Sequence, residues 1–346
     1  MSDNNQLPVI KCESVYKIFG NNAKKLLEDS NGNVDAKTFQ DAGCIVGVNN
    51  ASFDVKKGEM LVVMGLSGSG KSTLLRCISR LTNATAGKIF IDGDDLLSMN
   101  SKELIELRRN KMGMVFQNFA LLPHKTVLEN IAFPLQIKGT NTNESIAKAM
   151  EMVELVGLKG RENYFPRELS GGQQQRVGIA RSLAVEPDIW FLDEPFSALD
   201  PLIRKEMQNE FLRLQSMLKK TIVFITHDFD EAIRLADRIA IMFEGLIVQV
   251  GTAEQLITKP ATNYVAEFTK DIPRTKLLTA SSIMDQKNKE KLENTIKYNE
   301  KIENIASKII KSEKQFSVID DKNQVIGTLS KKEIIKTIFS ENNDYL

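Results

Sequence analysis

Residues 65–72 of this chain have the residue types and spacing of a loop that binds phosphate. They read Gly-Leu-Ser-Gly-Ser-Gly-Lys-Ser, follow an apolar run at residues 61–64 and precede a helical pattern at residues 73–78. Glycines let the backbone bend around an anion, so that successive N–H groups and the helix N-terminus point at phosphate oxygens. The lysine adds a charge near the β- and γ-phosphates, and the serine after it can ligate Mg²⁺. The alternative is an ordinary glycine-rich turn. We disfavour it because Lys-Ser at this offset would then have no role in packing. The candidate binding residues are Gly65, Ser67, Gly68, Ser69, Gly70, Lys71, Ser72 and Thr73.

Two adjacent carboxylates, Asp193 and Glu194, follow a second apolar run at residues 189–192. The carboxyl ends of parallel strands meet at one edge of a sheet, where a phosphate-binding loop also lies. Asp193 is therefore suited to the Mg²⁺ side of a bound nucleotide, and Glu194 to polarising the attacking water as a general base. An acidic turn after a strand is a common alternative, and the loop at residues 65–72 argues against it.

A second glycine-rich stretch, residues 169–173, reads Leu-Ser-Gly-Gly-Gln and opens a predicted helix at residues 173–185. A helix that begins this way is another anion-binding N-terminus, or simply a capped helix with flexible glycines. The stretch carries no lysine. We therefore interpret it as a surface that contacts a phosphate already held elsewhere.

Strands and helices alternate along most of the chain, which predicts a mainly parallel sheet covered on both faces. The character is mostly helical between residues 118 and 169, which we expect to form an inserted helical subdomain. A polar insertion occupies residues 20–45. The expected strands are residues 9–17, 46–55, 61–64, 87–91, 111–116, 189–192, 221–226, 238–243 and 246–250.

The composition allows a sizeable core but no strong electrostatic partner. Of 346 residues 42% are hydrophobic, and the net charge of +1 does not suggest a nucleic-acid partner. No apolar run approaches the roughly 20 residues of a membrane span, and residues 1–6 lack the features of a signal peptide. We expect a soluble chain in a reducing cytosol, with Cys12, Cys44 and Cys77 as unpaired thiols.

With these motifs in this order, residues 9–268 resemble the nucleotide-binding subunit of ATP-binding cassette (ABC) transporters. The resemblance implies an α/β P-loop NTPase fold of ABC type over residues 1–273, with a mainly parallel sheet, an antiparallel β segment and the inserted helical subdomain. It also assigns roles to Gln117, which senses Mg²⁺ and the membrane partner, and to His227, a switch residue that contacts the γ-phosphate. Glu194 is the family's catalytic base, and Lys71 and His227 assist it. The implied metal-binding residues are Ser72, Gln117 and Asp193.

The same resemblance implies a head-to-tail homodimer that encloses ATP and Mg²⁺. ATP on residues 65–72 of one subunit is covered by the signature stretch of the other, through Ser170, Gly171, Gly172 and Gln173. The opening and closing of the dimer is transmitted to transmembrane permease subunits through Gln117 and the helical subdomain. A substrate-binding protein is an indirect partner. The chain is then peripheral, at the cytoplasmic face of the plasma membrane.

The adenine base needs an aromatic face, which family members supply just before the first glycine turn. Phe19 is the better match, in Lys-Ile-Phe-Gly at residues 17–20, and Tyr16 is second. Both residues could equally be core aromatics.

The insertion at residues 20–45, the leucine at position 66 and residues 116–124 resemble those of glycine betaine/L-proline importers. The implied substrate is glycine betaine, proline, choline or a related quaternary amine osmolyte. Two alternatives remain: an importer for another small polar solute such as an amino acid, and a soluble ABC ATPase that acts on DNA or ribosomes.

The C-terminal residues differ in composition from the rest of the chain. Residues 285–301 are dense in Lys, Glu and Asn, which indicates a solvated linker or an exposed helix, and we expect the linker to span residues 274–301. Residues 302–346 resemble a single cystathionine-β-synthase (CBS) motif in a small α+β unit. One motif buries its sheet face poorly. Either two such tails pair across the dimer, or each tail is an appendage without a ligand.

Overall fold

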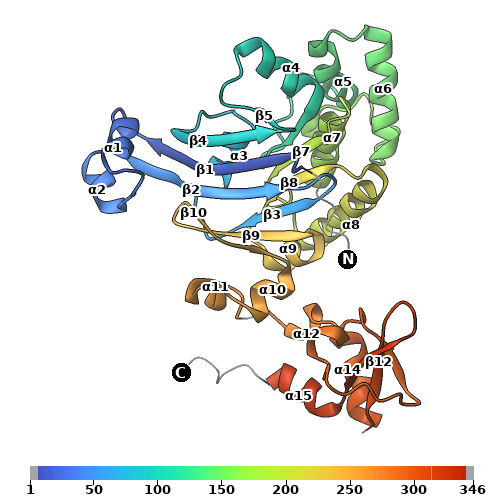
Figure 1. Cartoon of the computed structure of the whole chain (residues 1–346). Helices are drawn as coiled ribbons and strands as arrows, with labels where there is room; N and C mark the ends of the chain where they lie inside the picture. The colour runs from blue at the N-terminus through green and yellow to red at the C-terminus, as the bar shows by residue number, and fades with distance from the viewer. Residues whose placement is uncertain (1–6, 271, 313, 340–346) are drawn as a thin grey trace. The chain divides into compact units, whose positions relative to one another are not determined.

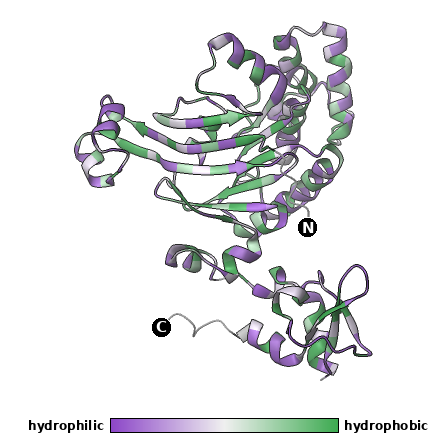
Figure 2. Cartoon of the chain, in the orientation of Figure 1, coloured by the Kyte–Doolittle hydropathy of each residue, from purple (hydrophilic) through white to green (hydrophobic). Residues whose placement is uncertain are grey.

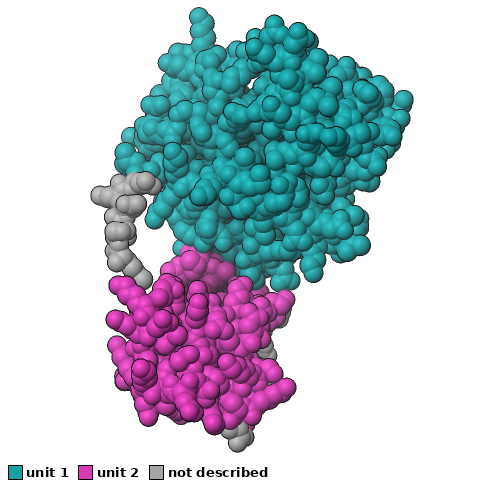
Figure 3. Space-filling model, turned by 90° about the vertical axis from the view of Figure 1, so that its right-hand side faces the viewer, with its two compact units in different colours: residues 1–250 teal, residues 251–346 magenta. Residues whose placement is uncertain are grey.

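A computed structural model describes residues 7–270, 272–312 and 314–339 (Figure 1). The chain divides into two compact units, Met1–Val250 and Gly251–Leu346 (Figure 3). No helix in the described ranges has both the length and the apolar character needed to cross a membrane.

The first unit contains a six-stranded sheet and a four-stranded sheet. The strands are β1 (Ile10–Phe19), β2 (Ile45–Val55), β3 (Met60–Met64), β4 (Ala86–Ile91), β5 (Asp94–Asp95), β6 (Met112–Val115), β7 (Ile189–Asp193), β8 (Thr221–Ile225), β9 (Arg238–Phe243) and β10 (Leu246–Gly251). The helices are α1 (Ala23–Asp29), α2 (Ala36–Asp41), α3 (Lys71–Ile78), α4 (Ser101–Lys111), α5 (Val127–Lys138), α6 (Thr142–Leu155), α7 (Gly171–Leu183), α8 (Pro201–Leu218) and α9 (Phe229–Leu235).

The six-stranded sheet has the order β10-β9-β3-β8-β7-β6, and every pairing from β9 to β6 is parallel. All residues of β3, β7 and β8 are buried, as expected for parallel strands covered on both faces. Hydrophobic stretches accordingly follow the central strands, whereas the outer helices alternate in character (Figure 2). The order brings the carboxyl ends of β3, β6, β7 and β8 to one edge of the sheet.

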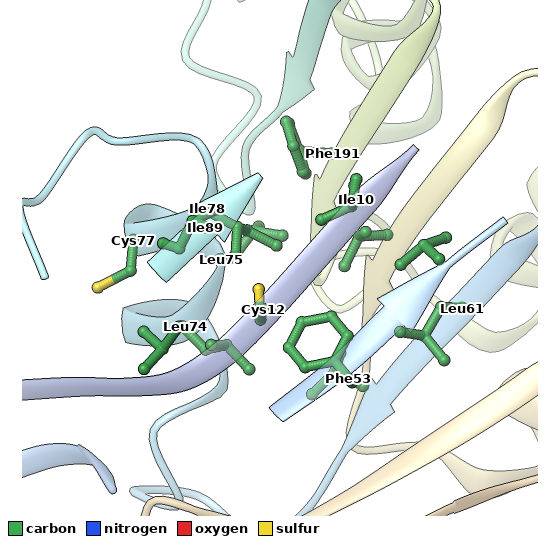
Figure 4. Close-up of a cluster of buried hydrophobic side chains, with 14 of the residues drawn as sticks. Ile10, Cys12, Phe53, Leu61, Leu74, Leu75, Cys77, Ile78, Ile89 and Phe191 are labelled. Atoms are coloured by element: carbon green, nitrogen blue, oxygen red, sulfur yellow. The ribbon is translucent and has the colours of Figure 1, made fainter. Parts of the chain in front are cut away.

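The four-stranded sheet has the order β2-β1-β4-β5 and is antiparallel. One buried apolar cluster joins this sheet, α3 and the six-stranded sheet. It includes Cys12 and Cys77, which are buried free thiols, as is Cys44 outside the cluster. Figure 4 shows Ile10, Cys12, Phe53, Leu61, Leu74, Leu75, Cys77, Ile78, Ile89 and Phe191 in this cluster. The expected combination of a parallel sheet with an antiparallel β segment is confirmed.

Aromatic side chains fill the space between the six-stranded sheet and α8. Trp190 lies with its ring centroid 5.3 Å from that of Phe211, and Phe211 also contacts Phe196 and Phe224. The indole Nε1 of Trp190 donates a hydrogen bond of 2.9 Å to the Ser182 hydroxyl of α7. This packing holds β7, which carries the two predicted carboxylates, between α7 and α8.

The helical part of residues 118–169 consists of α5, α6 and a short 3-10 helix at Pro166–Glu168. Both α5 and α6 pack against α7. Thr126 and Glu129 form a capping box at the start of α5. The segment is thus held against the helix that begins with the second glycine-rich stretch.

The insertion between β1 and β2 is folded. It forms α1 and α2 around a small apolar core that includes Leu27 and Phe39. Asp35 caps α2 by accepting a hydrogen bond from the Thr38 backbone N–H.

The second unit contains α10 (Ala253–Thr258), α11 (Asn263–Phe268), α12 (Arg274–Leu277), α13 (Ala280–Ile283), β11 (Thr295–Lys297), α14 (Ile302–Ser312), β12 (Phe316–Ile319), β13 (Val325–Leu329) and α15 (Lys331–Phe339). Its three-stranded sheet has the order β11-β12-β13, parallel and then antiparallel. The expectation of a solvated linker at residues 274–301 is wrong. That segment supplies β11 and the buried side chains of Leu278, Ala280 and Ile296 to the core of the unit. The resemblance of this unit to a CBS motif stays a prediction.

Candidate active site

The loop at residues 65–70 joins β3 to α3, and its backbone leaves no room for side chains at two glycines. Gly70, which caps α3, has φ +99°, and a Cβ there would lie 2.0 Å from the Gly47 carbonyl oxygen of β2. A Cβ at Gly65 would lie 2.1 Å from the Met242 carbonyl oxygen of β9. Glycine alone tolerates such approaches. The loop is therefore shaped by the strands on both sides as well as by its own residues.

Lys71 is the first residue of α3, and its side chain is only 6% exposed. Its Nζ donates hydrogen bonds of 2.9 Å to the carbonyl oxygens of Gly65 and Leu66. Burial lowers the pKa of Lys71, while the nearby carboxylates of Glu194 and Asp193 oppose that shift. The ammonium group thus lies inside the loop, where phosphate oxygens would accept its hydrogens.

Ser72 and Asp193 meet at the carboxyl end of β7. The Ser72 hydroxyl donates a 2.8 Å hydrogen bond to Asp193 Oδ1. Burial raises the pKa of Asp193, and the hydrogen bond from Ser72 opposes this shift. A hydroxyl and a carboxylate are the oxygen donors that Mg²⁺ takes from a protein when phosphates and water complete its coordination. The donor set therefore fits this cation.

Glu194, Gln117 and His227 come together although they follow three different strands. Glu194 Oε2 lies 3.3 Å from Gln117 Nε2, which can donate to it, and 3.2 Å from His227 Nδ1. Glu194 has a left-handed backbone, with φ +44°, and its N–H donates to the Ile225 carbonyl. The Ser197 hydroxyl in turn donates to the Glu194 carbonyl at 2.9 Å. Three residues singled out in the sequence thus share one cluster.

The signature stretch, residues 169–173, begins α7 and is capped by its own side chains. Ser170 caps α7, where its N–H donates a 3.0 Å hydrogen bond to Gln173 Oε1 and its hydroxyl accepts from the Gln173 N–H. Gly172 packs against α8, where a Cβ would meet Ile203. Among the described residues no hydrogen bond joins residues 170–173 to residues 65–73. Its capped N-terminus is thus not used by the loop of the same chain.

Phe19 and Tyr16 lie in different surroundings at the end of β1. Phe19 is 43% exposed, and a Cβ built on Gly47 would lie 3.1 Å from its ring and 3.0 Å from the Thr73 methyl group. Phe19 is therefore close to the start of α3. Tyr16 packs against the insertion, and its hydroxyl donates to the Gly32 carbonyl at 3.3 Å. Phe19 remains the prediction for the adenine-binding residue.

The sequence did not single out Gly47, whose carbonyl crowds Gly70 and where a Cβ would crowd both Phe19 and Thr73. The sequence does carry a signal for Gly47, because a glycine inside a strand often marks a close backbone approach. Met242, which crowds Gly65 through its backbone, has no such signal.

The amino-acid sequence and the fold match a known protein family. Residues 48–197 match the family model described as ABC transporter. The chain belongs to this family, and it is an ATP-binding and ATP-hydrolysing cassette.

Similar proteins extend the match beyond the cassette core. The chain is 72% identical to the trimethylamine N-oxide transport system ATP-binding protein TmoW of Pelagibacter ubique, over 96% of this chain and 98% of that protein. It is 46% identical to the glycine betaine transport ATP-binding protein OpuAA of Bacillus subtilis, over 97% of this chain and 83% of that protein. A solved bacterial ABC transporter cassette, described as a dimer in a post-hydrolysis state bound to ADP and Pi, is 33% identical. It covers 70% of this chain and 98% of its own, with a TM-score of 0.59.

Proposed function

We propose that this chain is the ATP-hydrolysing subunit of an ABC importer for a small quaternary amine or related osmolyte. Trimethylamine N-oxide and glycine betaine are the first candidates, followed by proline and choline. The observation that carries the proposal is the 72% identity along 96% of the chain to a trimethylamine N-oxide transport subunit. Other similar proteins are named for glycine betaine transport, which favours a transport role over action on DNA or ribosomes.

In the proposed mechanism the N–H groups of residues 65–72 and the Lys71 ammonium bind the phosphates of ATP. Ser72, Asp193 and Gln117 hold Mg²⁺, which neutralises charge on the phosphate oxygens when it is bound. Glu194 accepts a proton from the attacking water as general base. His227, 3.2 Å from Glu194, contacts the γ-phosphate.

The proposed working form is a head-to-tail homodimer in which residues 170–173 of one subunit cover the ATP of the other. Two observations support it: the capped N-terminus of α7 makes no hydrogen bond to residues 65–73 of the same chain among the described residues, and a 33% identical cassette has been solved as a dimer. The dimer works on permease subunits at the cytoplasmic face of the membrane, which receive solute from a substrate-binding protein. Gln117 and the helical segment at residues 118–169 are the proposed contacts with the permease.

We expect Ser170→Arg to block ATP-dependent dimerisation while the monomer still binds ATP. The larger side chain would occupy the space where the phosphates of the partner's ATP approach α7. Light scattering after size-exclusion chromatography with ATP measures the result, in a Glu194→Gln background that slows hydrolysis. Ser216→Arg, an exposed serine on α8, is the matched control. Dimerisation of the Ser170→Arg variant with ATP would contradict the proposed role of residues 170–173.

Solute uptake tests the proposed substrate. We expect membrane vesicles that carry the complete transport system to accumulate labelled trimethylamine N-oxide or glycine betaine. ATP must be supplied on the side of the membrane where the ATP-binding subunit lies. Vesicles with the Glu194→Gln subunit provide the control. Uptake of amino acids, with no uptake of trimethylamine N-oxide or glycine betaine, would contradict the proposed substrate class and support the alternative one.

A further inference from the structure

One arginine outside the residues discussed so far connects two of the loops at the candidate active site. Arg204 lies in the first turn of α8, and its Nη2 donates a 3.1 Å hydrogen bond to the Leu199 carbonyl oxygen. Its Nη1 forms an ion pair of 3.6 Å with Asp228 Oδ2. The remaining guanidinium nitrogen, Nε, is buried and has no hydrogen-bond partner among the described residues. Among the described residues, the guanidinium therefore bonds only to these two loops.

Asp228 fixes the backbone next to His227. Its Oδ1 accepts a 3.1 Å hydrogen bond from the Glu231 N–H, which caps α9. Its own N–H donates to the Thr226 hydroxyl at 3.0 Å. Because His227 lies between Thr226 and Asp228, these contacts fix the backbone position from which the imidazole side chain extends. The ion pair with Arg204 joins this position to α8.

The other contact of Arg204 leads back to Glu194 from the opposite side. Leu199 belongs to residues 194–199, where the Ser197 hydroxyl donates to the Glu194 carbonyl. His227 Nδ1 lies 3.2 Å from the Glu194 carboxylate. A closed path therefore runs from Glu194 through residues 197–199 to Arg204, then through Asp228 to His227 and back to Glu194. Arg204 is the side chain that closes it.

We propose that Arg204 is a positioning residue for ATP hydrolysis, which holds the segment after Glu194 and the loop of His227 in fixed register. This inference rests on the proposed roles of Glu194 and His227. A guanidinium presents its donors in a rigid fork and can serve two acceptors at once, whereas an ammonium acts as a point charge. The pair with Asp228 is partly exposed, 29% and 34%, so its contribution to overall stability is small. Its loss should therefore change the geometry of the site more than the stability of the fold.

Arg234 provides a matched control. It also joins α9 to α8, where its Nη1 donates to Gln208 Oε1 at 3.2 Å and its Nη2 to Asn209 Oδ1. Neither contact involves residues 194–200 or 226–228. Loss of the Arg234 side chain removes a similar link between the helices without touching the closed path.

Kinetics of the full chain test the proposal. We expect Arg204→Ala to lower kcat by about 10- to 100-fold while KM for ATP stays within about twofold. Arg204→Lys should recover part of the loss. Asp228→Asn keeps an oxygen for the α9 cap, so it should reduce kcat in a similar way, and the double variant should be no worse than Arg204→Ala alone. Arg234→Ala should leave kcat unchanged. A normal kcat in Arg204→Ala, or an equal loss in Arg234→Ala, would overturn the proposal.

A second readout does not depend on hydrolysis. The chain has 2 histidines, so the untagged protein should give two sets of imidazole signals by NMR with histidine labelling. We expect Arg204→Ala to shift the His227 signals and not those of His124, and Arg234→Ala to shift neither. Unchanged His227 signals in Arg204→Ala would overturn the positioning role. If Glu194→Gln hydrolyses ATP normally, the proposed role of Glu194 as the base fails instead, and the imidazole signals still decide the role of Arg204.

Discussion

Glu194→Gln lowers the rate of ATP hydrolysis by roughly 10²- to 10⁴-fold, the usual contribution of a positioned general base, and leaves ATP binding intact. The amide keeps the size of the carboxylate and retains an oxygen that can accept from Gln117 Nε2, now at 3.3 Å. It cannot accept a proton from water at neutral pH. The proposed phosphate-binding residues, above all Lys71, are unchanged. Steady-state phosphate release and equilibrium binding of ATP measure the two expectations separately.

The control removes an equal charge from a site away from the cluster. Glu186, whose side chain is exposed, forms an ion pair with Lys148 of α6, and Glu186→Gln should hydrolyse ATP at the normal rate. Turnover close to normal in Glu194→Gln would assign the base to another residue.

Lys71→Ala should weaken ATP affinity by about 10- to 100-fold, the value of one hydrogen bond to a charged group. In the structure the ammonium lies within the loop and donates to the Gly65 and Leu66 carbonyl oxygens. Its burial already disfavours the charged form, as the lowered pKa of Lys71 indicates. The phosphates of ATP would compensate that cost by accepting the same hydrogens. Isothermal titration calorimetry with a non-hydrolysable ATP analogue measures the affinity.

Two controls separate binding from folding for this variant. Lys111→Ala removes a lysine that pairs with Asp92, outside the loop, and should leave the affinity unchanged. Thermal unfolding of Lys71→Ala shows whether the loop still folds. A folded Lys71→Ala variant with normal affinity would contradict the role assigned to the lysine.

Much of the first unit was predictable because its signals are local. The apolar runs of β3, β7 and β8 identify strands buried on both faces, and α8 begins at a proline that favours the first helical turn. Glu194 and His227 follow β7 and β8, and Gln117 follows β6, which pairs with β7. The rule that parallel strands end at one edge then predicts their proximity.

What the sequence did not predict depends on contacts between distant segments. The three residues of β11 are surrounded by polar sequence, and their pairing with β12 becomes visible only in the structure. Leu278 and Ile296 are isolated apolar residues in a charged segment, so no period indicates that they are buried. The contact of Arg204 with Asp228 joins helices whose sequence positions carry no shared pattern.

Trp190 is the single tryptophan of the chain, and its buried indole lies in β7, three residues before Asp193. Intrinsic tryptophan fluorescence therefore comes from the first unit alone. If the second unit unfolds first during denaturation, far-ultraviolet circular dichroism should change before the fluorescence does. The wild-type chain thus carries a spectroscopic label that can separate the stabilities of the two units without any added dye.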